Sequence, residues 1–103
     1  MEYLLEATDD GVSVTLNGRM TFNNQAQWRS LMADLTEAGP KRVVVDISAV
    51  DFMDSTGLGM LLKLRSSARK EGWDLTVRRA RDGQVARLID LSQFGDLLPF
   101  EEV

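Results

Sequence analysis

The chain has 103 residues and a net charge of −4, and it contains neither cysteine nor histidine. This length suits a single domain with one core between two layers of secondary structure. The missing residue types exclude disulfides, thiolate chemistry, His-ligated zinc and Ser-His-Asp catalysis. We expect that the protein is not an enzyme and that it binds no metal and no cofactor. The negative charge disfavours direct binding to nucleic acid.

The N-terminal segment MEYLLEATDDG is acidic, whereas a secretion signal begins with basic residues. No apolar run approaches the length that a membrane span requires. We therefore expect a cytoplasmic protein without membrane insertion.

Positive charge gathers in one part of the chain. Residues 63–87 hold eight Lys/Arg against three Asp/Glu, a net +5, and the remaining residues hold four against thirteen, a net −9. A solvated helix face followed by a strand explains this distribution, and so does a basic surface that meets an acidic partner. Of the two, we favour the solvated face.

The first forty residues predict a hairpin and a helix. Residues 3–7 and 12–16 are typical of two short strands around the turn TDDG, since apolar and polar residues alternate in the second of them. After a polar break, Asn23 or Asn24 is a good N-cap for a helix that ends at Gly39-Pro40. The apolar face of this helix comprises Trp28, Leu31, Met32 and Leu35.

The rest of the chain alternates strands and helices. Residues 42–48, RVVVDIS, predict a strand buried on both faces, and a helix to about Lys70 follows, ended by Gly72. Residues 73–78 alternate like a strand with one wet face, residues 85–89 indicate a short helix, and LLPF near the end indicates a last strand. This order predicts an α/β fold with helices on a mostly parallel sheet, and an arrangement on one face is among the possibilities. The apolar face of the second helix comprises Leu58, Leu61, Leu62 and Leu64.

Residues 51–59, DFMDSTGLG, lie between the predicted strand and this helix, at the sheet edge where α/β proteins usually bind ligands or partners. Asp54 and Ser55 are both capable N-caps, and this alone explains one polar residue. A phosphate on Ser55 would face free N–H groups at a helix N-terminus and would add up to about two negative charges for a partner to sense. We consider both interpretations, a structural cap and a phosphorylated switch.

The other motifs in the sequence are weaker evidence for a ligand or metal site. The segment GLG lacks the third glycine of a dinucleotide fingerprint, because the pattern requires it where the chain has Leu62. The acids Asp46, Asp51 and Asp54 do not complete a metal cage. We interpret Asp46 as a structural residue within the strand and Asp51 as a turn residue.

The segment from RVVVDIS to LLPFEE, with its central FMDSTGLG and the closing VARLIDLSQFGDLLPF, resembles STAS domains, specifically bacterial anti-sigma factor antagonists. The N-terminal strands and the LNGRMTFNN turn match more loosely, so that residues 1–103 are expected to form a single STAS domain. The resemblance implies a four- to five-stranded, mostly parallel sheet with helices packed on one face, and no catalysis.

In this family the serine directly after the motif's aspartate is phosphorylated by an anti-sigma factor that is also a serine kinase, and a PP2C-type phosphatase reverses the modification. The resemblance therefore implies phosphorylation of Ser55, with Thr56 as the neighbouring alternative. It also implies that Asp54 contacts the kinase and that Gly57, Leu58 and Gly59 shape the docking edge. The unphosphorylated form would bind the anti-sigma factor and so free the sigma factor.

Two points qualify the resemblance. Better-known members carry acidic residues in the turn where this chain has Arg19-Met20-Thr21, which weakens the transfer of partner contacts to that turn. In the alternative interpretation, the chain is a structural STAS subunit of a lipid-transport complex or a signalling scaffold, in which the hydroxyl caps the helix and is never modified.

Overall fold

The computed structural model describes residues 1–103 as one five-stranded sheet with the strand order β1-β2-β3-β4-β5. The pair β1–β2 is antiparallel and the other three pairs are parallel, as the order of elements predicts. The strands are β1 (Glu2–Ala7), β2 (Gly11–Met20), β3 (Arg42–Met53), β4 (Asp74–Arg79) and β5 (Phe100–Glu102). The helices are α1 (Gln25–Ala38), α2 (Ser55–Glu71) and α3 (Gln84–Leu91), with 3-10 turns η1 (Phe22–Asn24) and η2 (Phe94–Asp96).

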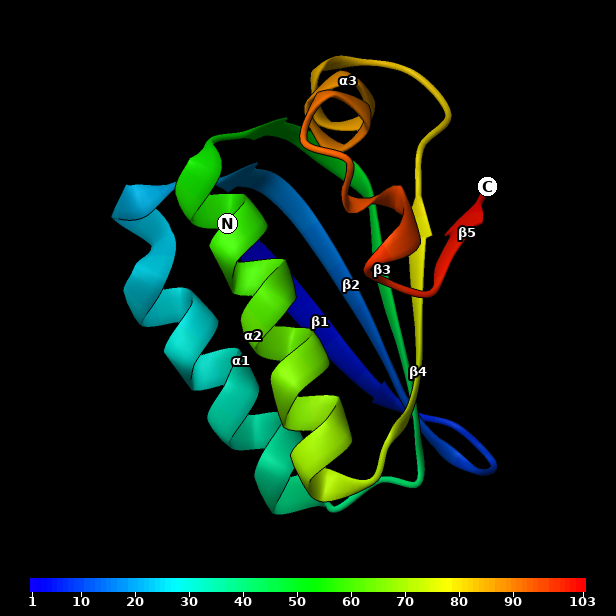
Figure 1. Ribbon diagram of the computed structural model, residues 1–103. Helices are drawn as coiled ribbons and strands as arrows, with labels where there is room; N and C mark the ends of the chain where they lie inside the picture. The colour runs from blue at the N-terminus through cyan, green and yellow to red at the C-terminus, as the bar shows by residue number, and fades with distance from the viewer.

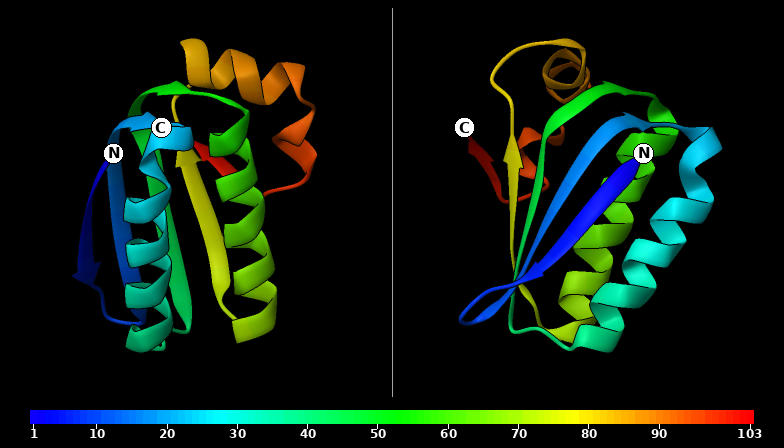
Figure 2. Two further views of the ribbon diagram at one scale, coloured as in Figure 1. Left: turned by 90° about the vertical axis from the view of Figure 1, so that its left-hand side faces the viewer. Right: turned by 180° about the vertical axis from the view of Figure 1, so that it is seen from behind.

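Helices α1 and α2 run side by side along one face of the sheet, and α3 lies beyond the carboxyl end of β3 (Figures 1 and 2). One core fills the space between the sheet and helices α1 and α2, because alternate strand residues point toward them, and buried residues of α3 extend it. Its fully enclosed side chains include Val14, Leu16, Val43, Val45, Leu31, Leu35, Leu61 and Leu64.

The prediction that β3 is buried on both faces is wrong. Val43, Val45 and Ile47 are buried, but Val44 and Asp46 between them are only half-buried. The reason is that no helix covers the second face of the sheet (Figure 2). The prediction for α2 also needs one correction. Leu62 is exposed, and Met60 takes its place in the buried stripe, since the two lie on different faces of the helix.

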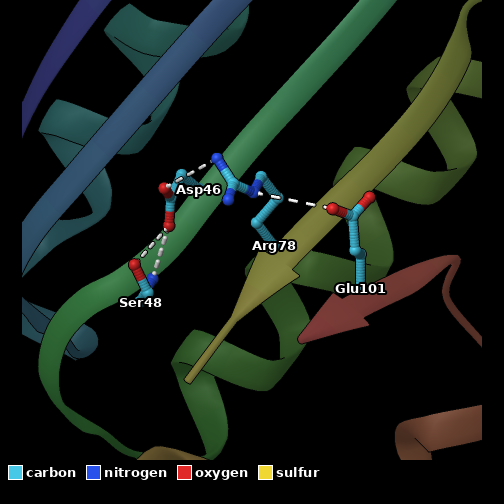
Figure 3. A network of polar contacts seen from close by, with 4 residues as sticks. All are labelled: Asp46, Ser48, Arg78 and Glu101. Carbon is cyan, nitrogen blue, oxygen red and sulfur yellow. Dashed lines mark hydrogen bonds and ion pairs between the residues drawn. The ribbon is translucent and has the colours of Figure 1, made fainter. Parts of the chain in front are cut away.

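The uncovered face of the sheet carries a polar network across three strands (Figure 3). The carboxylate of Asp46 accepts hydrogen bonds from the N–H and the hydroxyl of Ser48, at 2.8 and 2.6 Å. Arg78 forms ion pairs of 3.9 Å with both Asp46 and Glu101. Asp46 is therefore structural, as predicted from its place within the strand.

Strand β3 is longer than predicted and ends at Met53, one residue before the DSTG segment. Its register against β2 shifts twice, between the partners of Thr15 and Asn17 and between those of Gly18 and Arg19. Each shift places an extra residue in β3, as in a β-bulge. Asp51 lies at the second shift and belongs to the strand, so that its interpretation as a turn residue is wrong.

Candidate functional site

The carboxylate of Asp54 joins two turns at the carboxyl edge of the sheet. Its Oδ1 accepts a hydrogen bond from the N–H of Gly57 at 3.0 Å, which makes Asp54 the N-cap of α2. Its Oδ2 accepts from the N–H of Phe22 at 3.2 Å, and its own N–H donates to the carbonyl oxygen of Met20 at 3.3 Å. One side chain thus fixes the start of α2 against the turn between β2 and α1.

Gly57 permits the close approach of α2 to the sheet. A Cβ atom at this position would collide with the side chain of Met53 and lie 2.5 Å from the carbonyl oxygen of Met20. Gly59 has no such role, because a Cβ atom there would meet nothing within 4 Å. Leu58, between them, is 7% exposed and packs into the core.

Ser55 is the first residue of α2 and is exposed to solvent. Asp54 already caps the helix, and the hydroxyl of Ser55 makes no hydrogen bond within the chain. The N–H groups of a helix's first residues have no intrahelical acceptor and favour an anion nearby. Ser55 therefore combines an unoccupied hydroxyl with an environment that stabilises negative charge.

Thr56 has a different environment from its neighbour. It is half-buried and lines a hollow of about 180 Å³ between α1 and α2. Of the two hydroxyl residues in the motif, Ser55 is the more exposed to solvent.

Phe22 and Gln84 also belong to the site, although neither lies in a motif that the sequence makes recognisable. Phe22 is 69% exposed, and its N–H is the one that Asp54 binds, so that an aromatic side chain projects beside the residue preceding Ser55. The only signal in the sequence is an aromatic residue within the polar break. Asn24 occupies the N-cap position of α1, as predicted, but its side chain serves this turn, because its oxygen accepts hydrogen bonds from the N–H and hydroxyl of Thr21.

Gln84, the first residue of α3, holds the end of β3. Its Oε1 accepts from the N–H of Met53 and its Nε2 donates to the carbonyl oxygen of Met53, both at 2.8 Å. The side-chain amide thus pairs with the backbone as a neighbouring strand would, beyond the point where β4 has ended. No pattern in the sequence indicates this contact.

The profile of the STAS domain matches residues 3–103. The chain belongs to the STAS domain family. This STAS domain is 29% identical over 93 residues to the anti-sigma-F factor antagonist RsfA of Mycobacterium tuberculosis, an alignment that covers 88% of this chain and 72% of RsfA. The resemblance found in the sequence is thereby confirmed.

Solved structures agree with this assignment. The STAS domain matches an anti-sigma factor antagonist from Mycobacterium paratuberculosis with a TM-score of 0.82 and 26% identity, over 96% of this chain and 83% of the other. It matches SpoIIAA in its unphosphorylated form with a TM-score of 0.77 and 16% identity, over 99% and 88% of the two chains, a likeness that shows the fold. The predicted α/β fold of the family is confirmed as well.

The turn that departs from better-known STAS domains lies directly beside the motif. Met20 and Thr21 are buried, while Arg19 is exposed and its guanidinium lies 4.3 Å from the centre of the Phe52 ring. This STAS domain therefore presents a cation near the site, stacked on an aromatic ring. It has no group of three or more Asp and Glu side chains placed to hold a metal ion, and none of its helices has the length and apolarity of a membrane span.

Proposed function

We propose that this chain is a cytoplasmic anti-sigma factor antagonist whose binding is switched by phosphorylation of Ser55. In the unphosphorylated state it binds an anti-sigma factor that is also a serine kinase, and the sigma factor is released. The kinase transfers the γ-phosphoryl group of ATP to Oγ of Ser55, the hydroxyl proton leaves and ADP is formed. A PP2C-type phosphatase hydrolyses the phosphate and restores binding.

This proposal rests on one observation: Asp54 caps α2, and the hydroxyl of Ser55 does not. If the hydroxyl served only as a helix cap, as the structural-subunit alternative requires, it would bond a backbone N–H of the first turn. Asp54 makes that bond instead, and Ser55 is exposed with its hydroxyl free. Two similar proteins are consistent with such a switch. RsfA is named as an anti-sigma-F factor antagonist, and structures of SpoIIAA exist in both a phosphorylated and an unphosphorylated form.

Exposure also favours Ser55 over Thr56 as the phosphate acceptor. A kinase must place the acceptor oxygen in line with the γ-phosphorus, which an exposed first-turn residue allows and a half-buried one hinders. Asp54 then acts by position, because both of its oxygens are engaged by backbone N–H groups. The surface offered to the kinase comprises Ser55, Gly59 and the exposed ring of Phe22, with Gly57 and Leu58 beneath it.

The test is the intact mass of the protein recovered from its own cells, followed by fragmentation to locate any phosphate. We expect one phosphate on Ser55, absent in Ser55→Ala and retained in the matched variant Thr56→Val. A chain that stays unmodified under every growth condition, with Ser55→Ala fully functional, would favour the structural-subunit alternative. A phosphate retained in Ser55→Ala and lost in Thr56→Val would identify Thr56 as the phosphate acceptor.

A further inference from the structure

A groove between α1 and α2 begins next to the phosphate acceptor. Two hollows, of about 180 and 530 Å³, share the lining residues Trp28, Arg29 and Lys63 and therefore lie next to each other along the groove. The smaller hollow reaches Thr56, the neighbour of Ser55, and the larger one extends along the helices to Ser66 and Ser67. Figure 1 shows the two helices lying side by side over this length.

The groove is cationic and lacks internal neutralisation. No Asp or Glu lines either hollow, whereas Arg29 and Lys63 line both. The ion pairs of the chain involve Arg42, Arg78 and Arg79, so that neither groove cation has a carboxylate within 4.0 Å. In a protein with a net charge of −4, a groove with two uncompensated cations is an attractive site for negative charge.

The wall of the groove also offers apolar surface and an unused donor. Met32 and Met60 line the two hollows, one in each. Trp28 is only 3% exposed, and its indole N–H is buried without a hydrogen-bond partner. Buried donors are nearly always paired in folded proteins, and the residue that carries this unpaired one lines both hollows. A merely solvated helix face requires none of these features.

We propose that this groove binds an acidic segment of the protein partner that docks on the Ser55 surface. The inference rests on the proposed function for the partner's presence, and it adds the chemistry of the contact. Carboxylates of the segment pair with Arg29 and Lys63, and an apolar side chain enters the larger hollow beside Met32. A protein segment suits the groove because the groove lies next to the Ser55 surface where the partner docks, and because apolar side chains line it as well as cations.

The position of the groove explains how a phosphate on Ser55 releases the partner. Thr56, the neighbour of Ser55, lines the smaller hollow, so a phosphate on Ser55 adds up to about two negative charges close to the groove. Those charges repel the acidic segment and compete for the same cations, while the fold stays unchanged.

The groove can be tested without the kinase. In a Trp73→Phe background, Trp28 is the only tryptophan and its fluorescence reports on the groove. The probe is a short peptide of Glu, Leu and Gly, compared with its counterpart in which Gln replaces Glu. We expect the Glu peptide to bind, to weaken with salt, and to lose roughly tenfold in affinity in Arg29→Glu/Lys63→Glu.

The matched control is Lys41→Glu/Arg87→Glu, which makes the same change in net charge at exposed cations outside the groove and outside any ion pair. Equal weakening by both double variants, or equal binding of the Gln peptide, would overturn the groove assignment. Binding to phosphatidylglycerol vesicles that depends on Arg29 and Lys63, without peptide binding, would assign the groove to a lipid surface instead.

The variant Ser55→Asp tests the link between the groove and the switch. It should weaken binding of the Glu peptide severalfold, and unchanged binding would overturn that link. The peptide assay and the mass measurement of Ser55 are independent, so that failure of one proposal is distinguishable from failure of the other.

Discussion

Asp54 and Gly57 together determine how closely α2 approaches the ends of β2 and β3. The carboxylate of Asp54 accepts hydrogen bonds from the N–H of Gly57 in α2 and from that of Phe22 in the turn after β2. Gly57 has no side chain that would keep α2 away from Met20 and Met53. Ser55 and Thr56 lie between these two fixed points. Their positions are therefore held by their neighbours, and their own hydroxyls are left free for other uses.

The two glycines of the motif allow a matched prediction. We expect Gly57→Ala to destabilise the fold by about 1–3 kcal/mol, because the added methyl group meets Met53 and the carbonyl oxygen of Met20. We expect Gly59→Ala to be neutral or stabilising by up to about 1 kcal/mol, because its site is open and alanine favours the helix. Urea unfolding of both variants measures the difference, and a similar effect of the two would contradict the close approach described here.

At the scale of residues, sequence patterns predicted the site residues that are neighbours in the chain. They missed the residues that are distant in the chain but in contact in the fold. Residues 54–59 are recognisable because caps and glycines are local signals. Phe22 reaches Asp54 across 32 positions and Gln84 reaches Met53 across 31. Only the folded topology brings these pairs together, so no spacing rule could have found them.

At the scale of elements, Gln84 makes α3 a support for the end of β3. We expect Gln84→Leu to cost about 1–3 kcal/mol, because it leaves the N–H and carbonyl of Met53 without their partner. Amide hydrogen exchange should show faster exchange at Met53 and little change in the middle of β3. Gln27→Leu, at an exposed position of α1, is the control for the change in side chain. Unchanged exchange at Met53 would mean that α3 is not needed to hold this end of the strand.

A second contact between elements joins edge strand β1 to α1 and carries a pH dependence. The Tyr3 hydroxyl donates to Asp34 at 2.8 Å, and this hydrogen bond, with smaller contributions from burial and from the charge of Asp34, raises the pKa of Tyr3 above its ordinary value of 10.0. The folded state therefore holds the proton more tightly than the unfolded chain. The resulting stability is fully present below pH 10.0 and is lost as the pH rises through the raised pKa.

The comparison with Tyr3→Phe tests this dependence. Thermal unfolding as a function of pH should show a decline above pH 10.0 that is steeper in the natural chain than in the variant. The difference should be small, because the pair lies at the surface of the molecule. Parallel profiles for the two proteins would show that this hydrogen bond is not maintained in solution.

The elements themselves were largely predictable, and the exceptions have physical causes. Alternation and helix periodicity identified every strand and helix in the right order, and Gly39 and Gly72 end α1 and α2 in the left-handed conformation as expected. The far half of β3 was missed because its two register shifts interrupt the period of two. The prediction that both faces of β3 are buried was wrong because a β-branched run such as VVV is compatible with one covered face or with two.

At the scale of the whole molecule, the proposed switch changes the surface and leaves the fold intact. Ser55, the proposed phosphate acceptor, lies at the positive end of a 17-residue helix, and its hydroxyl makes no hydrogen bond within the chain. Negative charge at this position interacts favourably with the helix dipole, and the neighbouring charge of Asp54 opposes part of that gain. Ser55→Asp should therefore change the free energy of unfolding by no more than about 1 kcal/mol in either direction.

The charge-reversed variant Ser55→Lys separates the dipole from general effects of substitution. A cation at the helix N-terminus is unfavourable, and it also lies next to Asp54, which it can pair with at the surface for less than about 1 kcal/mol. We expect both variants to keep the far-ultraviolet circular dichroism of the natural chain and to unfold in one cooperative step. Their effects on the anti-sigma factor should diverge, because only Ser55→Asp places negative charge beside Thr56, which lines the cationic groove. Loss of cooperative unfolding in Ser55→Asp would mean that phosphorylation acts by disrupting the fold, and the switch would then need no partner-specific surface.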